Sequence, residues 1–413
     1  MYIKAKELYE KWGVDTEAAM EKCADIPVSL HCWQGDDVQG FEKGSIGASG
    51  GIQTTGDYPW RANNKVELMA DLDFVFRLIP GKKRLNLHAV YAITETDVDR
   101  DELEPRHFEE WLDWALRHGA GLDLNPTLFS HPLATDGMTL SHPDATVRDF
   151  WIRHIKACRK IAAFIGERQG TPCLNNIWIP DGLKNPPADR LSARLRLRDT
   201  LDDIFSVAYD KRCIIDTLES KVFGIGLENY TVGSSEFYIA YAATRGVNVL
   251  LDNGHYHPTE SIADKLPALL TFFEKVALHL THHVRWDSDH VVLFDDEIKD
   301  IAVEIIRNNA EDRVLIGLDY FDASINRIAA WVTGARNAQK SLLYALLLPH
   351  DGFKRLQETG NFSKLLAMQE EAKTLPFSAV WNEYLVRQNL SPDWFESVEQ
   401  YEQNILSKRT GDR

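Results

Sequence analysis

The regular alternation of strand-like and helix-like segments constrains the fold of this chain more than any other feature. Short apolar runs rich in β-branched residues recur eight times, and longer stretches with helical spacing of apolar residues separate them. Such alternation is typical of parallel strands joined by crossover helices. Eight strand–helix units predict an α/β fold of the closed (β/α)8 TIM-barrel type. The predicted strands are Ile26–His31, Arg84–His88, Gly121–Asn125, Leu174–Trp178, Cys213–Glu219, Val247–Asp252, Ala277–Thr281 and Arg313–Asp319.

The repeating units are longer than a minimal barrel needs. They average about 41 residues between His31 and Asp319, against about 31 in a barrel of about 250 residues. The excess is expected in loops, and the clearest is the long glycine-rich loop Gln34–Trp60, directly after the first strand. That position lies on the face where barrel enzymes place their active sites. Such loops favour a role as a lid over substrate, although a plain surface loop has the same composition.

Helical patterning fills the spaces between strands and the whole C-terminal part of the chain. Predicted helices include Glu104–His118, Ala145–Glu167 with Asp144 as its N-cap, and Ser261–Val276. The helix after the eighth strand is expected to end near Leu347, because Pro349 follows. We therefore expect residues 1–347 to form the barrel with an N-terminal helix, and residues 348–413 to form a C-terminal helical extension. The aromatic residues of this extension predict that it docks on the barrel or on a neighbouring subunit.

Composition narrows the class of protein. The chain has 413 residues, with 46 Lys and Arg against 62 Asp and Glu, a formal charge of −16. This acidic balance argues against a nucleic-acid partner, and the 44% hydrophobic content argues against disorder. No apolar run reaches the roughly 18 residues of a membrane span. The N-terminus is typical of an amphipathic helix, and the five scattered cysteines predict free thiols in a reducing cytoplasm.

Acidic and imidazole side chains gather at the ends of the last four predicted strands. In a barrel these strand ends point toward one mouth, so the side chains are expected to lie close together. One such Asp alone is more often a helix cap, as we expect for Asp296 and Asp322, but the coincidence over four successive strands favours a metal site. The residues concerned are Glu219 and Lys221, Asp252 and His255, His279 with Asp287 and Asp289, and Asp319.

The charge of this group predicts two divalent cations. Five carboxylates and one lysine carry a net charge of −4, which cannot stay ionised and partly buried without cations. Two imidazoles, His255 and His279, complete a ligand set of oxygen and nitrogen atoms. Such a set favours Mn²⁺, Mg²⁺ or Co²⁺ over a thiolate-type zinc site.

Lys221 lies two residues from the expected ligand Glu219. It is either a structural counter-ion or a hydrogen-bond donor to a carbonyl oxygen whose negative charge grows during a reaction. A dimetal centre with such a lysine suggests aldose–ketose isomerisation, in which hydride moves between C2 and C1. Trp33, Trp178 and Trp286 lie near strand ends, where they either exclude water from the hydride path or pack in the core.

Long matching stretches, in the right order along nearly the whole chain, give a specific resemblance. The chain resembles the L-rhamnose isomerases, metal-dependent sugar isomerases of the xylose-isomerase-like barrel group. The matching stretches are His31–Asp37, Gly50–Gly56, Arg84–His88, Asn176–Gly182, Glu219–Gly226, His255–Glu260, Arg285–His290 and Gly317–Arg327.

The resemblance implies interconversion of L-rhamnose and L-rhamnulose in rhamnose breakdown by a cytoplasmic homotetramer. It implies two metal ions per subunit, usually Mn²⁺, with Co²⁺, Mg²⁺ or Zn²⁺ as alternatives. Lys221 then polarises the substrate carbonyl, and Asp289 or a metal-bound hydroxide moves the O2 proton. By motif, Glu219, Asp252, His279 and Asp319 look like ligands of one metal, His255, Asp287 and Asp289 like ligands of the catalytic metal, and His88 and Trp178, with Trp33 beside them, like substrate contacts.

Other functions stay open from the sequence alone. The same barrel can serve an isomerase or epimerase of another aldose, or less readily a dimetal hydrolase. A non-catalytic sugar- or metal-binding protein is a third class, although Lys221 and the full ligand set argue against it. Hydroxyl stereochemistry is recognised by the shape of the pocket, which the sequence does not give.

Overall fold

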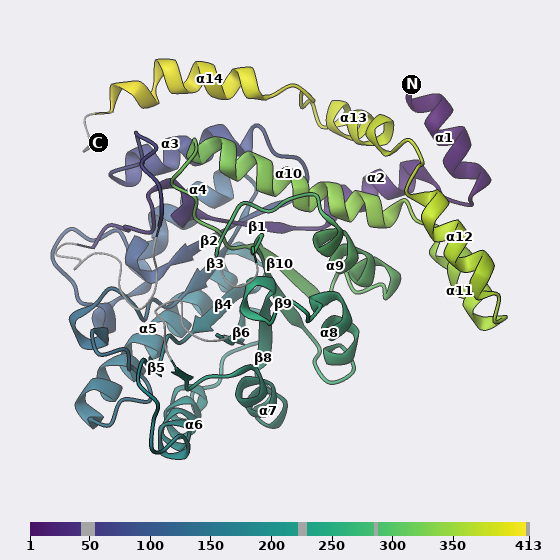
Figure 1. The fold of residues 1–413 in the computed structure, drawn as a ribbon. Coiled ribbons are helices and arrows are strands. Elements are labelled where there is room, and N and C mark those ends of the chain that lie inside the picture. The colour runs from purple at the N-terminus through teal and green to yellow at the C-terminus, as the bar shows by residue number, and fades with distance from the viewer. Residues whose placement is uncertain (43–53, 222–228, 285–287, 410–413) are drawn as a thin grey trace.

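Eight parallel strands close into a barrel in the computed structural model, which describes residues 1–42, 54–221, 229–284 and 288–409. Around the barrel the strand order is β1, β2, β3, β4, β6, β8, β9 and β10 (Figure 1). The predicted TIM barrel is confirmed, and each strand boundary lies within two residues of its predicted position. The bounds are β1 Val28–His31, β2 Lys83–His88, β3 Gly121–Asn125, β4 Cys173–Trp178, β6 Ile214–Glu219, β8 Asn248–Asp252, β9 Val276–Leu280 and β10 Val314–Leu318.

Helices surround the barrel, as Figure 1 shows. Two short strands, β5 (Gly182–Leu183) and β7 (Tyr230–Thr231), pair antiparallel outside the barrel sheet. The sequence did not predict this pair. The helices are α3 Lys65–Phe76, α4 Glu109–Arg117, α5 Ala145–Gln169, α6 Leu191–Phe205, α7 Ser235–Arg245, α8 Ile262–Leu269, α9 Asp296–Arg307 and α10 Arg327–Leu346. None of the helices in these described ranges has the length and apolar composition needed to cross a membrane.

Helix ends test the sequence predictions most closely. Asp144 caps α5 as predicted, because its carboxylate accepts the backbone N–H of Thr146. The predicted caps Asp296 and Asp322 are wrong: Asp295 caps α9 and Asn326 caps α10. In each case another residue accepts the backbone N–H of the first turn: Asp295 accepts from Ile298, and Asn326 accepts from Ala329.

Two predicted helices have different bounds in the structure. The pattern Glu104–His118 divides into a 3-10 turn, Pro105–Phe108, and α4, so the regular α-helix begins later than predicted. The pattern Ser261–Val276 becomes α8, which ends at Leu269. Apolar residues beyond that point continue the helical spacing, but they belong to the connection that leads into β9.

Further helices lie at both ends of the chain. The N-terminal helices are α1 Tyr2–Lys11 and α2 Thr16–Asp25, and the C-terminal ones are α11 His350–Glu358, α12 Phe362–Ala372, α13 Phe377–Arg387 and α14 Phe395–Asn404, followed by a 3-10 turn at Leu406–Lys408. Figure 1 shows α11 and α12 side by side, α13 near α1, and α14 passing across the barrel near α3 and α10.

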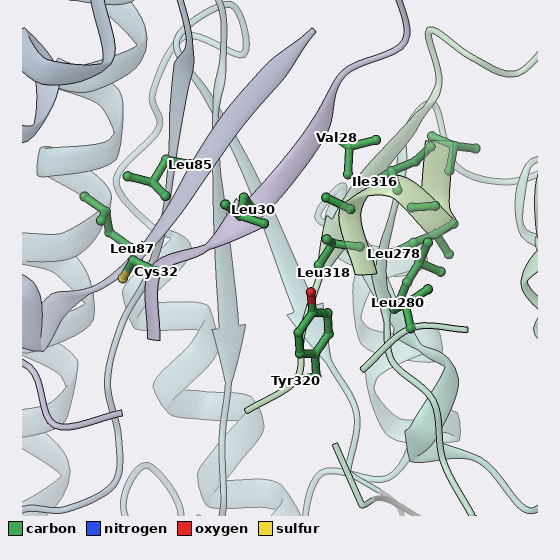
Figure 2. Close-up of a cluster of buried hydrophobic side chains, with 14 of the residues drawn as sticks. Val28, Leu30, Cys32, Leu85, Leu87, Leu278, Leu280, Ile316, Leu318 and Tyr320 are labelled. Atoms are coloured by element: carbon green, nitrogen blue, oxygen red, sulfur yellow. The ribbon is translucent and has the colours of Figure 1, made fainter. Parts of the chain in front are cut away.

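Alternation along each strand gives the barrel an apolar outside and a mixed inside. Figure 2 shows the outward side chains of four strands packed as a buried cluster: Val28 and Leu30 on β1, Leu85 and Leu87 on β2, Leu278 and Leu280 on β9, and Ile316 and Leu318 on β10. The residues between them point inward, because successive side chains of a strand face opposite sides. Inside the barrel, a small apolar cluster of Leu174, Ile215, Leu250, Ala277 and Leu315 fills part of the end opposite the predicted site.

Candidate active site

Four of the predicted ligands converge at the carboxyl ends of neighbouring strands. Glu219 ends β6, Asp252 ends β8, His279 lies in β9, and Asp319 follows β10. One ligand atom from each residue lies within 4.8 Å of all the others. The first three side chains are buried, and Asp319 is partly exposed toward the pocket. Three carboxylates and an imidazole therefore surround one small volume.

Each of these three carboxylates has one oxygen bonded to a donor of the protein. The second oxygen is thereby directed toward the centre of the cluster, which is how supporting hydrogen bonds orient metal ligands. Glu219 Oε2 accepts from the amide of Asn176 at 2.5 Å, Asp252 Oδ1 from the backbone N–H of Gly254 at 2.7 Å, and Asp319 Oδ1 from the indole N–H of Trp33 at 2.9 Å.

The second oxygens all face His279. Its Nδ1 atom lies 3.5 Å from Glu219 Oε1, 4.0 Å from Asp252 Oδ2 and 3.1 Å from Asp319 Oδ2. Within the described residues, neither ring nitrogen of His279 nor Glu219 Oε1 has a hydrogen-bond partner. Burial opposes a charged imidazole, yet the negative charges of Glu219 and Asp319 raise the pKa of His279 well above its ordinary value. Buried acceptors that converge in this way fit a divalent cation, and ligands of oxygen and nitrogen fit Mn²⁺, Mg²⁺ or Co²⁺.

Of the three residues predicted to bind a second cation, His255 adjoins the first group and Asp289 lines the same pocket. His255 Nδ1 donates to the backbone oxygen of Ser220 at 2.7 Å, which fixes the orientation of the ring. The same Nδ1 atom lies 3.3 Å from Glu219 Oε1, so the two groups adjoin. Asp289 lines the same pocket, with a positive φ of 46°. Asp287 and Trp286 lie outside the described residues.

A pocket of about 470 Å³ opens over these side chains. Its polar half is formed by the carboxylates and imidazoles described above. Its other half is apolar and consists largely of aromatic rings. The apolar lining comes from Trp33, Val38, Phe129, Trp178 and Phe321.

His88 contributes a neutral imidazole to this pocket. Its Nδ1 atom forms a hydrogen bond of 3.2 Å with the hydroxyl of Thr127, which also accepts the backbone N–H of Val90. Burial lowers the pKa of His88 to about 3, so the ring stays neutral.

Lys221 is as buried as Glu219 of the ligand cluster. Its ammonium group donates to the backbone oxygen of Pro180 at 3.1 Å and lies 5.5 Å from the ring of Trp178. The side chain is 2% exposed. The described lining of the pocket does not include Lys221, so Trp178 is the residue through which it adjoins the pocket.

Comparison with known proteins decides which family these features belong to. A family model described as L-rhamnose isomerase (RhaA) matches residues 1–409. The chain belongs to the L-rhamnose isomerase family. The L-rhamnose isomerases of Salmonella typhi and Salmonella paratyphi B are each 53% identical to it over 408 residues, which cover 98% of this chain and 97% of theirs.

A solved structure supports the fold of this family member. A crystal structure of D-psicose 3-epimerase in the presence of D-fructose matches with a TM-score of 0.50 and 12% identity, over 78% of this chain and 99% of that one. At this identity the likeness concerns the barrel alone. The family resemblance seen in the sequence is confirmed by the family match and not by this structure.

Several residues at the site were missed by sequence reasoning. Asn176 was not predicted, although it shares its inward face with Trp178, two residues further along β4. The hydroxyl of Thr217 donates to Asn176 Oδ1 at 3.0 Å, which orients the amide so that its NH2 group faces Glu219. Strand alternation is the signal that places Asn176 inward. The bond from Trp33 to Asp319 gives that indole a role beside its place in the apolar lining.

The long loop Gln34–Trp60 is described only at its two ends. Residues 43–53, the middle of the predicted lid, are outside the described residues. The first end reaches the pocket, since Val38 lines it. The second end packs against the segment after β10, where the backbone N–H of Tyr58 donates to the oxygen of Ala323 at 2.8 Å.

Proposed function

We propose that this protein interconverts L-rhamnose and L-rhamnulose as a metal-dependent aldose–ketose isomerase. The observation that carries the proposal is the convergence of three carboxylates and His279, with one ligand atom of each within 4.8 Å of the others, in a pocket whose other side is lined by aromatic rings. Family membership supplies the substrate. The alternatives raised from the sequence, another aldose, a hydrolase or a non-catalytic binder, are not favoured by this family.

We propose Mn²⁺ as the native metal, with two ions in each subunit. Glu219, Asp252, His279 and Asp319 would hold one ion, and His255, Asp287 and Asp289 the other. When bound, such cations act as Lewis acids that polarise the hydroxyl and carbonyl oxygens of a sugar. The oxygen and nitrogen atoms of the described ligands, with the support of Asn176, Trp33 and Gly254, favour this choice over a softer metal.

The residues of the chain would then orient the open-chain sugar and move its protons. The neutral imidazole of His88 binds a sugar hydroxyl. As hydride passes from C2 to C1, Asp289 accepts the O2 proton, and a proton is returned to O1, where the Lys221 ammonium stabilises the developing negative charge. Trp33 and Trp178 exclude water from the path of the hydride. The net change is one hydride from C2 to C1 and one proton from O2 to O1.

The direct test is turnover of a panel of aldoses by the purified protein, with ketose products separated by sugar chromatography. L-Rhamnose should give L-rhamnulose with the highest kcat/KM of the panel. A higher kcat/KM for another aldose would reassign the substrate. No ketose from any aldose, in a protein shown to contain metal, would refute the isomerase.

Assembly and location complete the proposal. We propose a homotetramer, supported by large apolar side chains exposed on the terminal helices: Ile3 on α1, Phe362 and Leu366 on α12, Val386 on α13 and Phe395 on α14. Sedimentation velocity should give four times the 47.0 kDa chain mass.

We propose residues 1–347 as the barrel unit and 348–413 as its extension. Five free cysteines support a cytoplasmic location.

A further inference from the structure

Two successive residues beside the pocket have a backbone conformation that disfavours their side chains. Asp37 and Val38 have φ angles of 60° and 59°, in the left-handed region. This region is rare for any residue other than glycine and is a genuine outlier for a β-branched residue such as valine. Val38 nevertheless lines the apolar side of the pocket. Such a conformation persists only where the surrounding structure determines it, and it is commonly found at functional sites.

A buried arginine binds the side chain of Asp37. Arg327, the first residue of α10, donates from Nε and Nη2 to the two carboxylate oxygens of Asp37 at 2.7 and 2.8 Å. The side chains of Arg327 and Asp37 are 8% and 11% exposed. A second cation, Arg61, lies 3.9 Å from the same carboxylate. The bidentate geometry fixes the orientation of the Asp37 carboxylate, directly before Val38 in the chain.

The same arginine also binds the second end of the long loop. Its Nη1 atom donates to the backbone oxygens of Tyr58 and Pro59 at 2.9 and 3.2 Å. One guanidinium group thus joins two segments of the loop that are about twenty residues apart in the sequence. All donors of Arg327 that contact these segments lie at the pocket end of α10.

The C-terminal helix α14 contacts both the second end of the loop and the start of α10. Glu402 Oε2 accepts from the hydroxyl of Tyr58 and from the side-chain amide of Asn326, both at 2.5 Å. Asn326 is the N-cap of α10, directly before Arg327. Arg409 adds a bond to the backbone oxygen of Trp60 at 2.9 Å. Figure 1 shows α14 lying over α10 and α3, on the outside of the barrel.

We propose that Arg327 and Glu402 are positioning residues that set the substrate-facing conformation of Asp37 and Val38. Through them, the C-terminal extension controls substrate binding from outside the barrel. The inference takes its substrate from the proposed function, but the geometry on which it rests does not depend on it. Neither residue belongs to the proposed metal ligands, so metal binding should not change with them.

The test compares Arg327→Lys, Arg327→Gln and Glu402→Ala with the wild-type protein. We expect KM for L-rhamnose to rise about tenfold in Arg327→Gln, because a displacement of roughly 1 Å in a positioned group has effects of this order or larger. Arg327→Lys should show a smaller rise, since lysine keeps the charge but not the bidentate geometry. Glu402→Ala should raise KM about threefold, while kcat and the Mn²⁺ affinity measured by calorimetry stay within about twofold in all three variants.

Arg159→Gln is the matched control. Arg159 is 5% exposed, binds both oxygens of Asp216, and donates to the backbone oxygens of Ile204 and Val207, so it repeats the surroundings of Arg327 on the outer side of β6. Its loss should lower the melting temperature but leave KM unchanged. A KM within twofold of wild type in all folded Arg327 variants and in Glu402→Ala would overturn the inference, as would an equal rise in Arg159→Gln.

Amide hydrogen exchange separates this inference from the proposed function. Peptides that cover residues 36–41 should exchange faster in Arg327→Lys and Glu402→Ala than in wild type, and at the wild-type rate in Arg159→Gln. This readout needs no substrate. A wild-type protein without isomerase activity would refute the proposed function, whereas unchanged exchange at residues 36–41 would overturn only the role of Arg327 and Glu402.

Discussion

The two ends of the barrel interior use carboxylates in different ways. At the N-terminal end, both oxygens of Asp123 are bonded twice: Oδ2 accepts from Ser29 and Arg84 at 2.7 and 2.9 Å, and Oδ1 from Arg84 and the backbone of Leu174 at 2.8 and 2.9 Å. At the C-terminal end, Asp319 has one oxygen bonded to Trp33 while the other faces His279.

A structural carboxylate and a candidate metal ligand inside the same barrel therefore differ in what faces their second oxygen. The charge of Asp123 is neutralised by Arg84, and every lone pair directed at the protein has a donor. Around His279, by contrast, Glu219 Oε1 and Asp319 Oδ2 lie 3.5 and 3.1 Å from one imidazole nitrogen. The group that faces the second oxygen of a carboxylate, and not the number of acidic residues, therefore indicates which carboxylates are suited to a cation. Changes at each end should have opposite consequences for activity and stability.

Removal of metal should have the largest effect on activity, because the candidate ligands lie at the C-terminal end of the barrel. Dialysis against a chelator, with metal content checked by mass spectrometry, should abolish isomerisation of L-rhamnose, and Mn²⁺ should restore it. The barrel should stay folded by circular dichroism, because Asp123 and the apolar cluster need no ion. Undiminished turnover in a protein shown to be metal-free would contradict the proposal.

Loss of the Lys221 ammonium should have the second-largest effect on activity. We expect Lys221→Ala to lower kcat by about 10²–10³, the usual result of removing a donor to a developing oxyanion. Mn²⁺ affinity, measured by calorimetry, should stay close to that of wild type, since Lys221 is not a ligand. A kcat within threefold of wild type would leave Lys221 as a structural counter-ion.

Removal of a supporting donor should weaken metal binding without removing a ligand. Trp33→Phe and Asn176→Ala should each lower Mn²⁺ affinity about 10–100-fold, because the freed carboxylate oxygen loses its fixed direction. Trp111→Phe is the control: this buried indole donates to the backbone oxygen of Tyr91 and not to a carboxylate. Equal affinities in Trp33→Phe and Trp111→Phe would argue against the supporting role of Trp33.

A change at the N-terminal end should affect stability and spare activity. Arg84→Met leaves Asp123 buried without its cation and should lower the free energy of unfolding by about 3–5 kcal/mol, measured by urea denaturation. At 25 °C the folded variant should keep kcat and KM within about twofold of wild type. A large loss of turnover at unchanged stability would show that the two ends are not separable.

Much of this organisation could be predicted from the sequence, for a physical reason. Strand alternation and strand ends are local properties, so the barrel and the acidic residues Glu219, Asp252 and Asp319 follow from them. The choice between Asp295 and Asp296 as the cap of α9 depends on one turn, where local patterns have little resolving power.

The rest depends on contacts that form only when the barrel closes. Trp33 meets Asp319 because β1 pairs with β10, and Asn176 meets Glu219 because β4 pairs with β6. Glu402 meets Tyr58 across more than 340 residues of sequence, so no local pattern indicates it. These supporting contacts are where the structure adds most to the sequence.

L-Rhamnose that carries deuterium at C2 gives the most direct test of metal-dependent hydride transfer. The Mn²⁺-loaded protein should form L-rhamnulose that retains the label at C1 by NMR, and the metal-free protein should form no product. Failure of the loaded protein to form L-rhamnulose, or formation of L-rhamnulose whose label has been lost to solvent, would contradict this mechanism.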